Sequence, residues 1–237
     1  GGTGSGEVQS AYTISFYDGL KKAGFSLDEN LKKAYLSYIT EEKEKRPKRM
    51  SILDVIKPVE EFPISEEQLQ QMSRNCEAAI ITIGRSAGEG SDRSLETDYV
   101  LNDKELALVK ATASAFHAQG KKLIIALNID AVVEVTKWQD LADALLITWL
   151  PGQEAGYAFA NIIAGKTNPS GKLPQTMALS YSDIPSATAF PGLPKRTPTE
   201  SVYNEGIYVG YRYFSSFGKP VAYPFGYGLS YTQFEMK

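Results

Sequence analysis

The chain has 237 residues, 43% of them hydrophobic and 22% charged, a composition that is ordinary for a soluble globular protein. The formal net charge is −3, from 25 basic and 28 acidic residues, and no long basic block occurs. This charge argues against nucleic acid and anionic membrane as partners, and small neutral ligands fit better. One cysteine, Cys76, excludes an internal disulfide. The sequence has one histidine, His117, which makes a zinc site or a histidine-based triad implausible, so no metal and no cofactor are expected.

The N-terminal segment GGTGSG, residues 1–6, gives the backbone freedom for a tight turn or for close approach to a ligand, unless it is simply a flexible end. It does not have the pattern of a signal peptide, and it resembles the start of a piece cut from a longer chain. The apolar runs of the sequence are far shorter than the roughly 20 residues of a membrane-spanning helix. No phosphate-binding GxxxxGK[ST] motif is present, which disfavours a flavodoxin-like nucleotide-binding domain.

Helices and strands are predicted to alternate along most of the chain. Capping residues, glycine stops and apolar spacing indicate helices at residues 13–23, 28–38, 66–75, 103–119, 131–142 and 152–166. Apolar, β-branched runs indicate strands at residues 78–83, 121–128 and 144–150. Parallel strands need long crossovers, and the crossovers here are helical, so the fold class is α/β with a mostly parallel sheet between helices.

From Tyr181 onward, prolines and glycines become frequent, and aromatic-rich loops with short extended pieces are expected in place of regular helices. Packing over the domain edge is favoured for these aromatic side chains, and a ligand-binding surface is the alternative. His117 falls in the last turn of the helix predicted at 103–119, where a histidine interacts favourably with the helix dipole. A structural role is therefore favoured for His117 over a catalytic one.

The candidate for chemistry is Glu89, which stands between Gly88 and Gly90 just after the strand predicted at 78–83. Open α/β sheets place their sites at the carboxyl ends of strands. The neighbouring glycines remove side-chain bulk, so a ligand can approach the carboxylate closely. Proton transfer is the chemistry that a carboxylate in this place can perform, and a solvated turn glutamate is the alternative.

Two arginines, Arg85 and Arg93, stand on either side of Glu89. Each could form an ion pair with Asp92, or donate bidentate hydrogen bonds to a substrate.

Five segments in order resemble glycoside hydrolase family 3, specifically the second, α/β-sandwich domain of its β-glucosidases. They are GGTGSG, GRSAGEGSDR, NPSGKLP, NEGIYVGYRYF and PFGYGLSYTQFE, and they run from Gly2 to Phe234. The resemblance implies a sheet of about six strands packed between helices. It also implies a sandwich domain at residues 1–215, followed at 216–237 by an aromatic-rich tail leading toward a fibronectin type III-like domain.

The resemblance further implies a mechanism. Enzymes of this family are retaining exo-glycosidases that act on β-glucosides or oligosaccharides, with an aspartate nucleophile on a preceding (β/α)8 barrel. In the β-glucosidase branch, the acid/base glutamate lies in a Ser-Gly-Glu-Gly type of loop of the sandwich domain, which matches residues 87–90 and assigns this role to Glu89. Ser5 matches a position that reaches the sugar in the first subsite, and Arg85 is a second predicted substrate-binding residue. Arg93 is expected to hold the loop through a salt bridge.

The chain also departs from the family pattern. Its one Ser-Asp pair before a bulky apolar residue, Ser182-Asp183, lacks the tryptophan and the strand context of the nucleophile motif. The nucleophile is therefore expected on another domain, and the chain alone is predicted to be inactive. The family's domain begins with a strand before GGTGSG, so one strand fewer is expected here. Ser91 stands where similar proteins often have an aromatic residue. A non-catalytic carbohydrate-binding or regulatory module is the alternative function.

Overall fold

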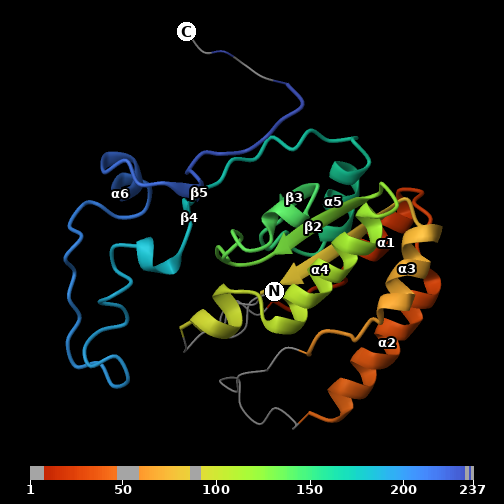
Figure 1. Ribbon diagram of the computed structural model, residues 1–237, viewed down its shortest axis with the longest axis horizontal. Coiled ribbons are helices and arrows are strands. Elements are labelled where there is room, and N and C mark those ends of the chain that lie inside the picture. Colours follow the sequence, from red (N-terminus) through yellow and green to blue (C-terminus); the bar gives the residue numbers. More distant parts are fainter. Residues whose placement is uncertain (1–7, 47–58, 86–91, 233–234, 236–237) are drawn as a thin grey trace. The chain divides into compact units, whose positions relative to one another are not determined.

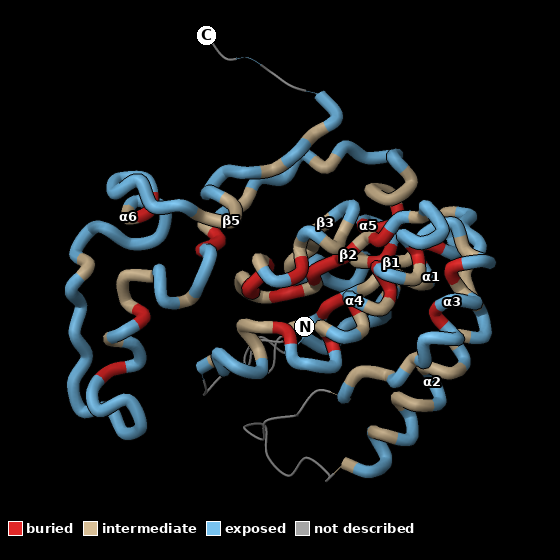
Figure 2. The backbone as a smooth tube through the Cα atoms, in the orientation of Figure 1, coloured by how far each residue is buried: buried red, intermediate tan, exposed pale blue. Residues whose placement is uncertain are grey.

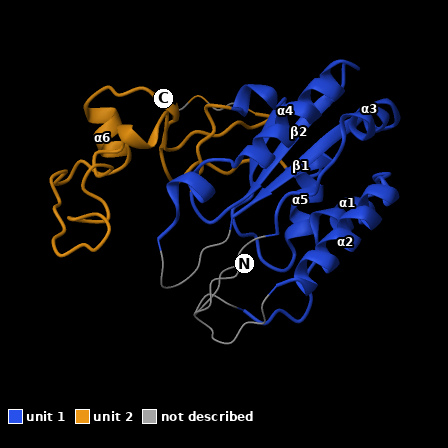
Figure 3. Cartoon of the chain, turned by 60° about the horizontal axis from the view of Figure 1, so that its bottom comes forward, with its two compact units in different colours: residues 1–131, 138–167 blue, residues 132–137, 168–237 orange. Residues whose placement is uncertain are grey.

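The computed structural model describes residues 8–46, 59–85, 92–232 and 235 (Figure 1). Contacts between residues divide the chain into two compact units (Figure 3). The first comprises residues 1–131 and 138–167, and the second comprises residues 132–137 and 168–237. This division does not coincide with the boundary predicted after residue 215, which stays a prediction.

The first unit is built on a parallel sheet of β1 (Ala78–Gly84), β2 (Lys122–Asn128) and β3 (Ala144–Ile147), in the order β1-β2-β3. The predicted α/β class with parallel strands is confirmed. Within the described residues this sheet has three strands, fewer than the about six that the family resemblance implied.

Helices cover both faces of the sheet (Figure 3). The helices of this unit are α1 (Phe16–Lys22), α2 (Glu29–Glu44), α3 (Glu66–Asn75), α4 (Asp103–His117) and α5 (Ala155–Ile163). On one face, Leu20 of α1 and Phe159 of α5 form a buried cluster with Ala126 of β2. Side chains alternate along a strand, so Ile125 and Leu127, both fully buried, point to the other face, where α4 contacts β1 and β2. Figure 2 shows this burial concentrated in β2.

The predicted helix starts are largely confirmed. Ser65 and Gln68 form the expected capping box at the start of α3, and Asn102 and Glu105 form one at the start of α4. Asp28 caps α2, and that helix continues to Glu44, beyond the end predicted near residue 38.

The helix predicted at residues 131–142 is wrong. The only helical turn there is a short 3-10 turn, Gln139–Leu141. The preceding segment is rich in β-branched residues, which lose χ1 freedom in a helix. Val133 and Val135 are instead buried, with 2% and 0% of their surfaces exposed, in a segment without regular structure.

The second unit is mostly irregular, as predicted, with a two-stranded antiparallel sheet of β4 (Met177–Ala178) and β5 (Val221–Tyr223). A 3-10 turn spans Tyr181–Asp183. The expectation that no regular helix occurs from Tyr181 onward is wrong at α6 (Tyr211–Ser216). Among the described residues, no helix has both the length and the apolar character needed to cross a membrane.

Candidate active site

The carboxyl ends of the three parallel strands meet at one edge of the sheet. Gly84 at the end of β1 pairs with Asn128 at the end of β2, and Leu127 pairs with Ile147 at the end of β3. Backbone hydrogen bonds extend the pairing by one residue, from Arg85 N to Asn128 O at 3.0 Å and from Thr148 N to Leu127 O at 2.8 Å. The residues that follow the strands therefore begin at the edge where α/β proteins bind ligands.

Arg85, the residue directly after β1, points its side chain into the protein, with only 8% of that side chain exposed. Its Nη1 and Nη2 donate to the two carboxylate oxygens of Glu105 at 2.7 and 2.9 Å. Its Nε donates to the backbone oxygen of Asp98 at 2.7 Å, and Nη2 also reaches the backbone oxygen of Val100 at 3.3 Å. All three guanidinium nitrogens thus meet protein acceptors.

Glu105 holds Arg85 from the first turn of α4. The Glu105 side chain is only 9% exposed, and its Oε2 also accepts from the backbone N–H of Asn102 at 2.9 Å as part of the capping box. Removing one partner of such a buried pair typically costs about 3–5 kcal/mol, because the other charge is left buried and unpaired. Burial, and secondly the charge of Glu105, raise the pKa of the Glu61 carboxyl.

Asp98 also binds a second arginine, Arg93. Asp98 lies in a short π-helical turn, Leu95–Tyr99, that is capped by Ser94. Its Oδ2 accepts from Arg93 Nε at 3.0 Å, its Oδ1 accepts from Arg93 Nη2 at 3.1 Å, and Arg85 Nε lies 3.3 Å from Oδ1. We refer to Arg85, Arg93, Asp98 and Glu105 as the arginine–carboxylate network.

Trp149 follows β3 at the same edge and has a positive φ of 52°, which is uncommon for a residue other than glycine. The side-chain amide of Asn128 donates to the Trp149 carbonyl, and Thr148 Oγ1 donates to Leu127 O at 2.9 Å. Strained backbone of this kind is concentrated at functional sites. No feature of the sequence predicted this conformation.

The sequence-predicted site residues have different outcomes. Glu89 and Ser5 lie outside the described residues. Arg93 forms a salt bridge with Asp98, a partner that the sequence did not indicate. The pair with Asp92 and the role of Arg93 in holding the loop stay predictions. The contacts of Arg85 favour a structural role over the substrate contact predicted for it, which stays a prediction. Sequence reasoning missed Asp98, and it identified Glu105 only as a capping residue.

His117 lies at the other end of the sheet. Its Nε2 is 2.9 Å from Oδ2 of Asp143, a residue just before β3 that also pairs with Lys122 at the start of β2. The hydrogen bond from Lys122, and then that from the Leu123 amide, hold the pKa of Asp143 well below its usual range. Among the described residues, no group of three histidine, cysteine, aspartate or glutamate side chains could hold a metal ion.

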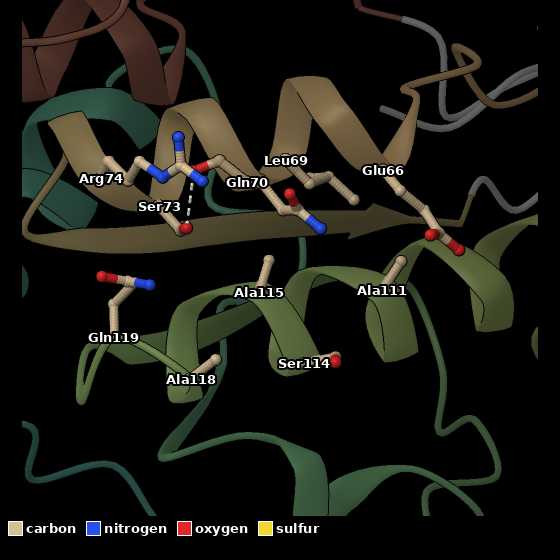
Figure 4. A pocket seen from close by; sticks show the side chains of 10 residues that line it. All are labelled: Glu66, Leu69, Gln70, Ser73, Arg74, Ala111, Ser114, Ala115, Ala118 and Gln119. Carbon is tan, nitrogen blue, oxygen red and sulfur yellow. Dashed lines mark hydrogen bonds between the residues drawn. The ribbon is translucent and has the colours of Figure 1, made fainter.

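A hollow of about 350 Å³ runs between α3 and α4 (Figure 4). The small side chains of Ala111 and Ala115 on α4, and of Ala118 just after it, leave the space. On the α3 side, Ser73 donates its hydroxyl to Gln70 O at 2.9 Å. A second hollow of about 420 Å³ lies beside it, near Phe62 and Leu108. Both lie between helices and are lined by none of the residues that follow the strands, so neither is the candidate active site.

A parallel sheet covered by helices, with charged residues at the carboxyl ends of its strands, defines this protein as an α/β domain with a candidate site at the sheet edge. The family model described as Glycosyl hydrolase family 3 C-terminal domain matches residues 1–211. The chain therefore belongs to glycoside hydrolase family 3 and corresponds to its C-terminal domain.

Relatives of known name support this assignment. A β-glucosidase of Ruminococcus albus is 35% identical over 239 residues, which cover 99% of this chain and 24% of that protein. The structure of β-glucosidase 3B from Thermotoga neapolitana in complex with glucose matches with a TM-score of 0.90 and 46% identity, over 98% of this chain and 32% of that one. A β-glucosidase of Paenibacillus barengoltzii matches with a TM-score of 0.84 and 31% identity, over 98% of this chain and 25% of that one. The chain thus spans about a quarter to a third of these relatives.

Proposed function

We propose that this chain is the domain of a retaining exo-β-glucosidase that supplies the general acid/base, Glu89. The enzyme hydrolyses terminal β-D-glucosyl residues, and the aspartate nucleophile is contributed by a (β/α)8 barrel outside this chain. The observation that carries the proposal is the position of Glu89, between two glycines and shortly after β1, in a chain that belongs to a family of glycoside hydrolases. The chain alone supplies the acid/base without the nucleophile, so by itself it does not hydrolyse glucosides.

In the first step, the Glu89 carboxylic acid gives its proton to the glycosidic oxygen while the aspartate carboxylate bonds to the anomeric carbon and the leaving group departs. In the second step, the Glu89 carboxylate takes a proton from water, whose oxygen displaces the aspartate and releases glucose. Retention requires the two carboxyl groups to lie about 5–5.5 Å apart. Glu89 regains its proton in the second step, so the cycle closes.

Ser5 is proposed to contact the sugar in the first subsite. For Arg85, direct contact with the substrate stays part of the proposal. The contacts of its guanidinium with Glu105 and Asp98 also suit a residue that supports the site from within the protein.

The test uses the chain assembled with its barrel and compares two substrates. Cellobiose has a poor leaving group that needs protonation, and 2,4-dinitrophenyl β-glucoside has a leaving group that needs none. Glu89→Ala should lower kcat/KM for cellobiose by about 10²–10⁴-fold, the usual contribution of general acid catalysis, and change it little for the dinitrophenyl glucoside.

The control is Glu96→Ala, which removes an exposed glutamate of the π-helical turn. It should leave both substrates unaffected. If Glu89→Ala hydrolyses cellobiose as fast as the unsubstituted enzyme, Glu89 is not the acid/base. That result would favour a non-catalytic carbohydrate-binding domain. Substantial hydrolysis of an aryl glucoside by the chain without a barrel would refute the division of the two carboxyls between domains.

A further inference from the structure

We propose that Asp98 is a positioning residue for the acid/base: it binds both arginines that flank residues 86–91 and so fixes the two ends of the segment that carries Glu89. This inference rests on the proposed function of Glu89. It concerns a residue that does not touch substrate and acts through its neighbours in the chain.

The first support is the way Asp98 divides its carboxylate. Arg93, on the C-terminal side of the segment, bonds to both oxygens, at 3.0 Å from Nε and 3.1 Å from Nη2. Arg85, on the N-terminal side, lies 3.3 Å from Oδ1 through its Nε. One carboxylate thus joins two cations that the sequence separates by the proposed acid/base. Without the Asp98 carboxylate, the two guanidinium groups would lose the counter-ion that they share.

The second support is that Asp98 is itself held in place. Its backbone N–H donates to Ser94 O at 3.2 Å, and its backbone oxygen accepts from Arg85 Nε at 2.7 Å. The turn that carries it is π-helical, a conformation that is rare and frequent at functional sites. The Asp98 side chain, 21% exposed, is therefore presented to the arginines by a fixed backbone.

The third support is that Arg85 connects this turn to the core of the first unit. Glu105 on α4 binds the same guanidinium through both oxygens, and α4 packs against β1 and β2. Arg85 also continues the β1 pairing through its backbone N–H to Asn128 O. The N-terminal end of the segment is thus anchored by strand and helix, and at the C-terminal end Asp98 binds Arg93 through both carboxylate oxygens.

The expected effect follows from how strongly proton transfer depends on geometry. A displacement of about 1 Å in a catalytic group can cost about 10²-fold in rate. Losing the Asp98 charge weakens the ion pair that fixes Arg93. The rate should therefore fall for a substrate whose leaving group needs protonation, and change little for one whose leaving group does not. A residue that only stabilised the fold would lower both activities together.

The experiment measures kcat/KM of Asp98→Asn, an isosteric change, in the chain assembled with its barrel, with cellobiose and 2,4-dinitrophenyl β-glucoside as substrates. We expect a loss of about 10–100-fold on cellobiose and less than about 3-fold on the dinitrophenyl glucoside. Asp103→Asn, which removes an exposed carboxylate at the start of α4, is the matched control and should change neither value.

A double-mutant cycle with Glu89→Ala separates the two proposals. With 4-nitrophenyl β-glucoside, adding Asp98→Asn to Glu89→Ala should bring no further loss, because a positioning residue has no effect once its target is absent. An additive loss, or an equal loss on both substrates, overturns the role of Asp98. If Glu89→Ala itself is not selective for cellobiose, the proposed function fails instead. If Asp98→Asn does not fold, Arg93→Lys serves as the second variant, because it keeps the charge and loses the bidentate contact with Asp98. Arg93→Lys must then lose more activity on cellobiose than on the dinitrophenyl glucoside, by a smaller factor, or the inference fails.

Discussion

Two glycines let α1 and α5 approach until their backbones touch. An ideal Cβ on Gly156 of α5 would lie 2.0 Å from the backbone oxygen of Ser15, and one on Gly19 of α1 would lie 1.9 Å from the oxygen of Gly156. Real Cβ atoms essentially never lie within 3.0 Å of a non-bonded heavy atom, so Gly156→Ala must push the segments apart by about 1 Å, the difference between 3.0 and 2.0 Å. The hydrogen bond from Gly156 N to Ile14 O, 3.0 Å long, opposes that movement.

The expected change in unfolding free energy for Gly156→Ala is the balance of opposing effects. In an open helix, Gly→Ala would stabilise by about 0.5–1 kcal/mol through backbone entropy. Here the overlap should cost about 1–3 kcal/mol. Weakening the Gly156–Ile14 hydrogen bond adds about 1 kcal/mol, and the gap reduces contacts such as the stack of Phe16 on Phe159, whose centroids are 4.2 Å apart. The expected net loss is about 2 kcal/mol of unfolding free energy, or about 4–8 °C in Tm for a chain of this size.

Urea and thermal unfolding, followed by circular dichroism, measure this loss. Gly171→Ala is the matched control: an added Cβ there meets no atom within 4 Å, and its φ is not in the left-handed region, so the change should stay within about 0.5 kcal/mol. A Gly156→Ala variant as stable as the parent chain would refute close backbone packing of α1 on α5.

Two further predictions concern stability. Lys122 and the Leu123 amide lower the pKa of the Asp143 carboxyl in the folded state. The contribution of Asp143 to stability is therefore complete above its pKa in the unfolded chain, about 4, and is lost as the pH falls below that value. Asp143→Asn should flatten the acid side of the stability profile measured by urea unfolding between pH 3 and 7, and an unchanged slope would contradict the ion pairing. Ser65→Ala removes the acceptor for the Gln68 N–H at the start of α3 and should cost about 1 kcal/mol in the same assay, whereas Ser65→Asp, which can also cap, should cost much less. No loss of stability in Ser65→Ala would show that the cap contributes nothing.

The elements that the sequence predicted well are those with local causes. The start of α4 follows from Asn102 and Glu105 alone, and β2 follows from an apolar, β-branched run of strand length, so both were found within a residue or two. The segment at 131–142 has apolar residues at spacings compatible with a helix, but its β-branched Val133 and Val135 are buried without forming one. Tertiary burial there outweighs the local pattern.

The sequence predicts where the candidate site lies, and only part of the charged network beside it. A strand followed by a glycine-flanked acid indicates the sheet edge, since that rule depends on chain order. The partners of Arg85 do not follow from chain order, because Asp98 and Glu105 lie on a turn and a helix whose placement depends on packing. A guanidinium beside a glycine-rich loop is equally compatible with a substrate and with buried carboxylates, and the 8% exposure of the Arg85 side chain favours protein contacts.

Glu105 and Asp98 hold the same arginine, but a change in each would have different consequences. Oε2 of Glu105 accepts from both Asn102 N and Arg85 Nη2, each at 2.9 Å, so the start of α4 and the end of β1 depend on one oxygen. A Glu105 variant therefore alters helix capping and the arginine contact together, and its effect on activity cannot be separated from its effect on folding. The Asp98 carboxylate binds the two arginines that flank the proposed acid/base, and its side chain is more exposed. Of the two carboxylates, Asp98 is thus the one whose substitution tests the positioning of Glu89 with the smaller disturbance of the core.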